Sequence, residues 1–182
     1  MNKEFLIITF LSNSQSASLQ RGNVYAKNAT YEQKRAFQKD FRMRLRVLES
    51  CYMQSVSDED HFRTIEGFAN QLSQAHSTAL ANGRLRIGTA QKAVNLFLKF
   101  LWSIGVVPEP PHCPIDRNVL TKIGISKNWT ELDNIEEYKS IIGTIRQKAG
   151  QQTPARWEYD LWNKMAEQSG EANAWPAYLD FS

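Results

Sequence analysis

Residues 90–105, AQKAVNLFLKFLWSIG, decide the fold class of this chain. Apolar side chains cover most of the circumference of a helix with this sequence, so the helix is expected to be buried. One polar stripe remains, in which residues are spaced by three, four and four: Lys92, Asn95, Lys99 and Ser103. We expect Lys99 to lie on the solvent face. Lys92 sits in the first turn of a buried helix, a costly place for a lysine unless it faces a cleft or a partner.

Helical signals precede this stretch. Thr30 can cap a helix to about residue 53, in which apolar residues recur at helical spacing: Phe37, Phe41, Leu45 and Leu48. Ser57, followed by three acidic residues, starts a helix to about residue 81, where Asn82-Gly83 ends it. The Ser-, Asn- and Gln-rich residues 12–28 are expected to form a loop.

Further helices are expected after the central stretch. Thr89 can cap the helix that Gly105 ends, and three prolines make residues 106–113 an extended connector. Helices are then expected at 115–123, within 129–149 and at 155–168, the last opened by Pro154. No alternating run indicates a sheet, and residues 1–182 show no domain boundary. The sequence therefore predicts one all-α domain.

Composition narrows the class of protein. The chain has 182 residues, enough for one domain with a buried core. Its two cysteines, Cys51 and Cys113, are not part of a CxxC pattern, so zinc ribbons and iron–sulfur clusters are not supported. We expect a reduced, cytoplasmic setting. The apolar residues 5–11 are too few for a membrane span of about 20 residues, and packing against the core is favoured over a signal peptide.

Charge is distributed unevenly along the chain. Residues 1–125 hold 16 basic and 10 acidic residues, for a charge of +6, whereas residues 126–182 hold 6 and 9, for −3. The helix at 30–53 is the densest basic element, with Lys34, Arg35, Lys39, Arg42, Arg44 and Arg46. Such a basic side suits a polyanionic partner, although an ordinary solvated surface has the same charges.

A carboxylate follows the central helix at a defined place. Asp116 comes 24 residues after Lys92, in the first turn of the helix expected at 115–123. The positive end of the helix dipole favours an ionised carboxylate there. An Asp near a helix start is also a common purely stabilising residue, so its position alone leaves both interpretations open.

Taken together, residues 87–93 (IGTAQKA) and 114–119 (PIDRNV) resemble the helix-hairpin-helix/Gly-Pro-Asp superfamily of DNA glycosylases. They look most like its archaeal 8-oxoguanine glycosylase branch. The resemblance covers residues 83–123, and it departs from the usual Leu-Pro-Gly-x-Gly hairpin, which here reads GRLRIG without proline. It implies a compact two-lobed helical domain with a helix-hairpin-helix element and a cleft between the lobes.

The resemblance also implies a chemistry, in which Lys92 and Asp116 are the catalytic residues. The Lys92 amine would attack C1′ of a modified nucleotide and form a Schiff base, with β-elimination as a possible second step. Attack needs the neutral amine, and apolar surroundings disfavour an ammonium ion. The Asp116 carboxylate would stabilise positive charge on the sugar. No cofactor or metal is implied, and the expected partner is double-stranded DNA with an oxidised purine or another bulky modified base.

The resemblance also leads us to expect particular residues to bind DNA. We expect phosphate contacts from Arg84, Arg86, Gln91, Arg117 and the backbone amides of Gly88 and Thr89. The flipped base would enter a pocket formed by His112, Pro114, Trp157, Glu158 and Trp162, with Trp129 as a further candidate.

Two other functions stay open at this point. The chain could be a helical nucleic-acid-binding module without catalysis, or an interaction protein whose basic helix at 30–53 meets an acidic partner. In each case we expect a monomer with no membrane contact.

Overall fold

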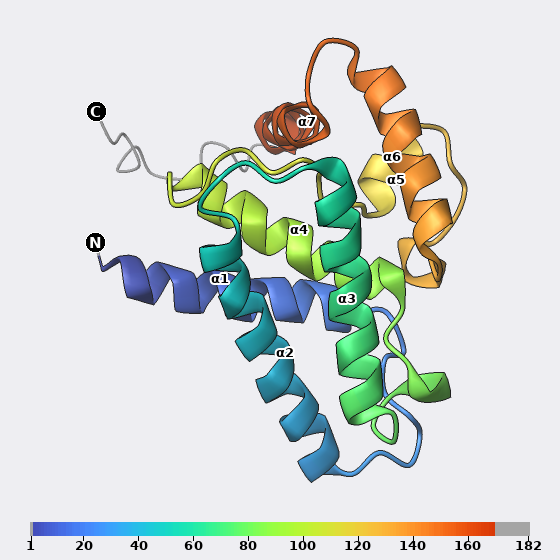
Figure 1. Ribbon diagram of the computed structural model, residues 1–182. Coiled ribbons are helices and arrows are strands. Elements are labelled where there is room, and N and C mark those ends of the chain that lie inside the picture. The colour runs from blue at the N-terminus through green and yellow to red at the C-terminus, as the bar shows by residue number, and fades with distance from the viewer. Residues whose placement is uncertain (1, 170–182) are drawn as a thin grey trace.

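The computed structural model describes residues 2–169, so the aromatic segment 175–182 lies outside the described residues. It is all-α, as the sequence predicts, and residues 2–169 contain no strand beyond an isolated bridge between Tyr25 and Leu80 (Figure 1). The seven α-helices are α1 Lys3–Leu19, α2 Tyr31–Cys51, α3 Asp58–His76, α4 Ile87–Ser103, α5 Arg117–Lys122, α6 Ile135–Ala149 and α7 Pro154–Ser169. Two short 3-10 helices are η1 Ala81–Gly83 and η2 Trp129–Glu131. None of the described helices has both the length and the apolar character that a bilayer span requires.

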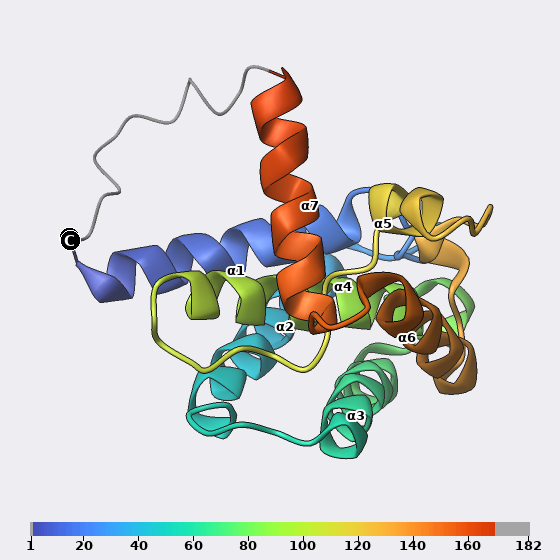
Figure 2. The ribbon, with the colours of Figure 1, turned by 90° about the horizontal axis from the view of Figure 1, so that it is seen from above.

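The helix α4 lies at the centre of the molecule, as its sequence predicts. Most of its apolar residues are buried, among them Ala93, Val94, Phe97, Leu98 and Leu101. The helices α1, α2, α3 and α6 and the 3-10 helix η2 pack against it. Figures 1 and 2 show α4 enclosed by these elements, with α7 crossing near it. Side chains on α4 therefore lie between packed helices on several sides.

The first helix corrects the expected loop at residues 12–28, because α1 continues to Leu19. Ile7 and Leu11 are buried, so the apolar start of the chain packs against the core as predicted. The residues that argued for a loop, Ser14 and Ser18, are also buried. The helix α1 packs against α4, and this tertiary packing outweighs the weak preference of its serines for helix.

Several helix ends differ from their expected positions. The helix α3 ends at His76 and not near residue 81, and α4 begins at Ile87, with Arg86 and not Thr89 as its N-cap. Thr89 is buried inside α4. Asp116 is the N-cap of α5, one position before the first turn in which it was expected. These shifts of a few residues are typical of boundaries set by tertiary contacts.

Gly88 holds the start of α4 against η2. A Cβ atom at this position would lie 1.9 Å from the carbonyl oxygen of Trp129, so only glycine permits the approach. The Gly88 amide donates a hydrogen bond to the carbonyl of Leu132 at 2.8 Å. The segment after α5 is thereby attached to the turn of α4 that precedes Lys92.

Candidate active site

Lys92 and Asp116 meet in the structure. The Nζ atom of Lys92 lies 3.0 Å from Oδ2 of Asp116, and the two side chains are 11% and 32% exposed. The other carboxylate oxygen, Oδ1, accepts a hydrogen bond from the backbone amide of Val119 at 3.1 Å. Asp116 therefore caps α5 with one oxygen and faces the amine with the other. The cleft expected at this pair stays a prediction.

The electrostatic setting keeps Asp116 ionised. Burial alone would raise the pKa of its carboxyl group, but the Lys92 ammonium and the hydrogen bond from Val119 outweigh burial, so the pKa lies below its ordinary value. A carboxylate in this state can stabilise a neighbouring cation.

A second ion pair lies on the same face of α4, and it corrects the expectation that Lys99 is solvent-exposed. Lys99 Nζ lies 2.7 Å from Oε2 of Glu158, and the side chains are only 12% and 8% exposed. The helix α7 supplies Glu158 and covers this part of α4. Lys99 also lies 5.5 Å from the ring centroid of Trp162, which is 49% exposed. The sequence did not indicate that α7 crosses α4 here, because this crossing depends on contacts between residues far apart in the chain.

The two ion pairs form one cluster of alternating charges. Lys92 and Lys99 are about two helical turns apart and so share a face of α4. Burial raises the pKa of Glu158 against the effect of Lys99, and the charges of Lys92 and Asp116 also act on it. The buried thiol of Cys113 is close to the same charges: burial raises its pKa, and Glu158 and Asp116 raise it further against the opposing effect of Lys99. The arrangement links α4, α5 and α7 at one place.

Gln91 has a different place from the one expected. It was predicted to contact DNA, but it is completely buried, and its side-chain amide binds the backbone of Ile115. A buried amide with protein partners cannot reach a phosphate, so this prediction is wrong. Gly88 also fails as a phosphate contact through its amide, because the carbonyl of Leu132 already accepts that hydrogen bond.

His112 is likewise buried and not part of an open base pocket. Its Nδ1 lies 3.0 Å from the hydroxyl of Tyr138, and its ring packs against those of His61 and Phe62. Burial, aided by the charges of His61 and Arg146, lowers its pKa to about 2. His112 therefore belongs to a neutral, enclosed polar network that the sequence did not indicate.

The other aromatic and proline candidates for the base pocket differ in how deeply they are buried and in what they contact. Trp129 and Pro114 are buried, and the backbone of Trp129 packs on Gly88. Trp157 is partly buried and packs against the hydrophobic core. Of the candidate residues, Glu158 and Trp162 are the ones that contact the charge cluster, both through Lys99.

The expected phosphate contacts occupy two regions. Arg84, Arg86 and the buried Thr89 line one small surface depression. Arg84 forms an ion pair with Asp133, and Arg86 donates a hydrogen bond to the carbonyl of Thr130 at 3.1 Å. These contacts place both guanidinium groups at the α4 end next to η2.

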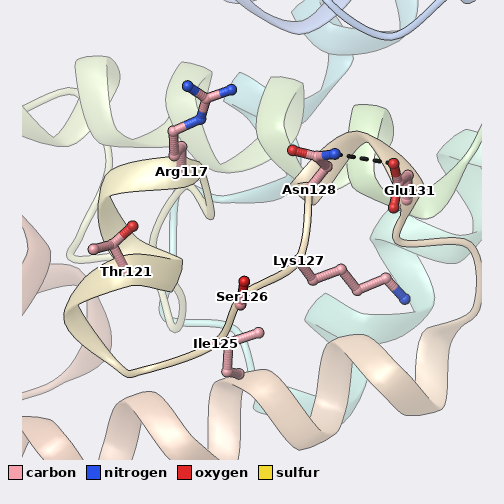
Figure 3. Close-up of a pocket in the computed structure, with 7 residues that line it drawn as sticks. All are labelled: Arg117, Thr121, Ile125, Ser126, Lys127, Asn128 and Glu131. Carbon is pink, nitrogen blue, oxygen red and sulfur yellow. Dashed lines mark hydrogen bonds between the residues drawn. The ribbon is translucent and has the colours of Figure 1, made fainter.

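Arg117 lines a separate pocket directly after Asp116. Figure 3 shows this pocket, of about 380 Å³, between α5 and the loop that leads to η2. Its lining is mostly polar and also includes Thr121, Ser126, Lys127, Asn128 and Glu131. Hydroxyl, amide and cationic donors of this kind can contact a phosphate, although Glu131 adds a negative charge.

Comparisons with models of protein families, with curated protein sequences and with solved structures found no match to this chain.

Proposed function

We propose that this protein is a DNA glycosylase that removes a modified base through an imine formed on Lys92. The observation that carries the proposal is the 3.0 Å contact between Lys92 Nζ and Asp116 Oδ2. A partly shielded amine beside an ionised carboxylate is the pair that this chemistry needs. The order of the motifs in residues 83–123 supports the same reaction, and so does the position of Asp116 at the start of a helix.

In the proposed reaction, Lys92 attacks as the neutral amine, and the Asp116 carboxylate stabilises the positive charge that develops on the sugar and takes the proton that the nitrogen loses after the attack. The amine attacks C1′, so that the N–C1′ bond forms while the glycosidic bond breaks, and the base leaves with the electron pair and takes up a proton. The sugar ring then opens to an iminium ion. Loss of a proton from C2′ would expel the 3′ phosphate and give lyase activity. A helix-hairpin-helix element at α3 and α4, and a cleft between two lobes, are parts of this proposal.

Base recognition is assigned to the second ion pair. Trp162 offers an exposed aromatic face for stacking, and Glu158 offers a carboxyl group that can bind the edge of a purine. An oxidised purine or another bulky modified base is the proposed substrate. Arg84, Arg86 and Arg117 would bind the phosphates of the double-stranded DNA.

The basic side chains of α2 favour a second candidate function, a nucleic-acid-binding or acidic-partner-binding module without catalysis. Lys39 and Arg42 are exposed on this helix. Figures 1 and 2 place α2 away from α5, the helix that begins after Asp116. A partner bound at α2 would therefore not need the Lys92–Asp116 pair.

Borohydride trapping separates the two functions. Wild-type protein is incubated with duplex oligonucleotides that each carry one modified base, and borohydride is added to reduce any imine to a stable amine. We expect an adduct with at least one duplex, the same adduct with the control Lys148→Gln on the exposed face of α6, and none with Lys92→Gln. DNA affinity of Lys92→Gln should be nearly unchanged, because phosphate contacts dominate binding.

Two results would contradict the proposal in different ways. Duplex binding without an adduct for every base would favour the non-catalytic function. An adduct that persists in folded Lys92→Gln would show that another amine does the chemistry.

A further inference from the structure

Gln91 connects the two elements that carry the proposed catalytic pair. It directly precedes Lys92 on α4, and its side chain binds the residue that directly precedes Asp116. Its Nε2 donates to the carbonyl of Ile115 at 2.8 Å, and its Oε1 accepts from the amide of Ile115 at 3.0 Å. The two bonds tie the connector after α4 back onto α4, at the position where Asp116 begins α5.

The Gln91 amide uses its full capacity for hydrogen bonds. A side-chain amide has two N–H donors and an oxygen with two acceptor sites. Besides the bonds to Ile115, Nε2 donates to the carbonyl of Gly88 at 3.0 Å, and Oε1 accepts from Nδ2 of Asn95 at 3.3 Å. Because every site has a partner inside the protein, a different orientation or side chain would leave a buried polar group unpaired.

A chain of buried hydrogen bonds fixes the orientation of the Gln91 amide, so that its nitrogen binds the carbonyl of Ile115 and its oxygen binds the backbone amide of Ile115. Asn95 accepts from Nε2 of His61 at 2.8 Å, so its Nδ2 is free to donate to Gln91 and to the hydroxyl of Tyr138, the latter at 2.9 Å. Nδ1 of His61 lies 2.6 Å from the hydroxyl of Tyr52, which can donate to it. The proton therefore sits on Nε2 of a neutral His61, and the direction of each following bond is set.

We propose that Gln91 is the positioning residue of the Lys92–Asp116 pair, an inference that rests on the proposed function. Oδ2 of Asp116 reaches Lys92 only while the backbone at residues 115–116 is held in place, and the Ile115 amide and carbonyl are both bound by Gln91. Loss of this clamp allows the carboxylate to move away from the amine. A misplacement of about 1 Å in a reacting group can lower a rate by about 10²-fold.

Gln91→Met tests the inference, because methionine keeps the length of the side chain and removes both hydrogen bonds to Ile115. Two quantities are measured: the single-turnover rate of base release with saturating DNA, and the pKa of Asp116 from the NMR titration of its labelled carboxyl carbon. We expect the rate to fall by about 10²-fold with unchanged DNA affinity. The pKa of Asp116 should rise, because the carboxylate moves away from the Lys92 ammonium, and the acidic limb of the rate–pH profile should move with it.

The control is Gln38→Met, the same substitution at a partly buried glutamine of α2 whose Nε2 donates to Tyr25. It should change neither the rate nor the Asp116 titration, which separates positioning from a general loss of stability. If circular dichroism shows that Gln91→Met does not fold, Gln91→Asn takes its place, since its amide is one methylene too short to reach Ile115.

The outcomes distinguish this inference from the proposed function. A folded Gln91 variant with wild-type rate and an unchanged Asp116 titration would overturn the positioning role. If the wild type releases no base from any duplex, the proposed function fails. The Asp116 titration then decides by itself whether Gln91 positions the carboxylate.

Discussion

Asp116 has two structural contacts that use different oxygens. Oδ1 caps α5 through the amide of Val119, and Oδ2 contacts Lys92. A cap needs only an acceptor oxygen, whereas charge stabilisation needs the carboxylate. The two roles of this residue can therefore be separated by a substitution that removes the charge and keeps an oxygen.

Asp116→Asn is expected to fold and to lose base release. Asparagine is as good an N-cap as aspartate, so the melting temperature should change little. The rate should fall by about 10²–10³-fold, the usual effect of removing one electrostatic group from an active site. Calorimetry and single-turnover kinetics measure the two effects. A variant that is unstable, or one as active as the wild type, would indicate that Asp116 serves only as a cap.

Gly88→Ala is expected to destabilise the protein strongly. The added Cβ would lie 1.9 Å from the Trp129 carbonyl oxygen, which belongs to the backbone and cannot rotate away. The free energy of unfolding should fall by roughly 3 kcal/mol, as for severe overpacking. Gly67→Ala on α3 is the control, because nothing lies within 4 Å of its Cβ, and it should stabilise the helix by about 0.5–1 kcal/mol. Urea unfolding measures both, and equal effects would contradict the close approach.

At the scale of elements, α4 contributes residues to two buried polar assemblies. One is the charge cluster on the face toward α5 and α7. The other is the neutral network of Tyr52, His61, Asn95, Tyr138 and His112, which connects α4 to α3 and α6. Burial lowers the pKa of His61 to about 4, although Asn95 and Asp58 partly oppose it. Burial therefore favours the neutral form of both histidines, although Asp58 Oδ1 lies 3.5 Å from Nε2 of His112.

This network predicts that the free energy of unfolding falls as the pH is lowered from about 6.5 to 4. Below about pH 6.5 the unfolded chain binds protons at His61 and His112 that the folded protein does not bind, so stability rises with pH from about 4 to 6.5. Each histidine contributes a slope of about 1.4 kcal/mol per pH unit. In His112→Phe, which keeps an aromatic ring, the slope should fall by about that amount. Equal slopes for wild type and variant in urea unfolding between pH 5 and 6.5 would refute this.

At the scale of the whole molecule, the basic residues of α2 and Arg117 of α5 lie on different elements. The helix α2 packs mainly against α1, α3 and α4, and part of its charge is neutralised by ion pairs such as Arg44–Asp40 and Arg46–Glu4. Arg117 is the first residue of α5, directly after Asp116, and Figure 1 places α5 away from α2. DNA held for base release should therefore contact Arg117 and not the exposed face of α2.

The salt dependence of DNA binding tests this arrangement. Each phosphate contact contributes a slope of about −0.9 in a plot of log affinity against log salt. Arg117→Gln should reduce the magnitude of the slope by about one contact, whereas Lys39→Gln on α2 should leave it unchanged. Fluorescence anisotropy with a modified duplex at several salt concentrations provides the measurement. The reverse pattern would place the DNA on α2 and favour the non-catalytic candidate.

The helices were largely predictable because their signals are local. Caps and apolar stripes at helical spacing indicated α2, α3 and α4, and the prolines at residues 108–111 indicated the extended connector. The second half of α1 was not predictable, because serines are weak helix formers until packing buries them. For the site, sequence pattern singled out Lys92 and Asp116, but it assigned Gln91 to DNA and Lys99 to solvent.

The sequence by itself determined that this protein is all-α, with a buried central helix that carries a lysine in its early turns and a carboxylate at the start of a later helix. Those properties follow from hydrogen bonding and side-chain periodicity within about one or two turns of chain. Only the tertiary structure decided that Lys92 contacts Asp116, that Glu158 neutralises Lys99 and that Gln91 binds Ile115. Each of these contacts joins residues at least 24 positions apart, and their geometry depends on how α4, the connector and α7 pack together.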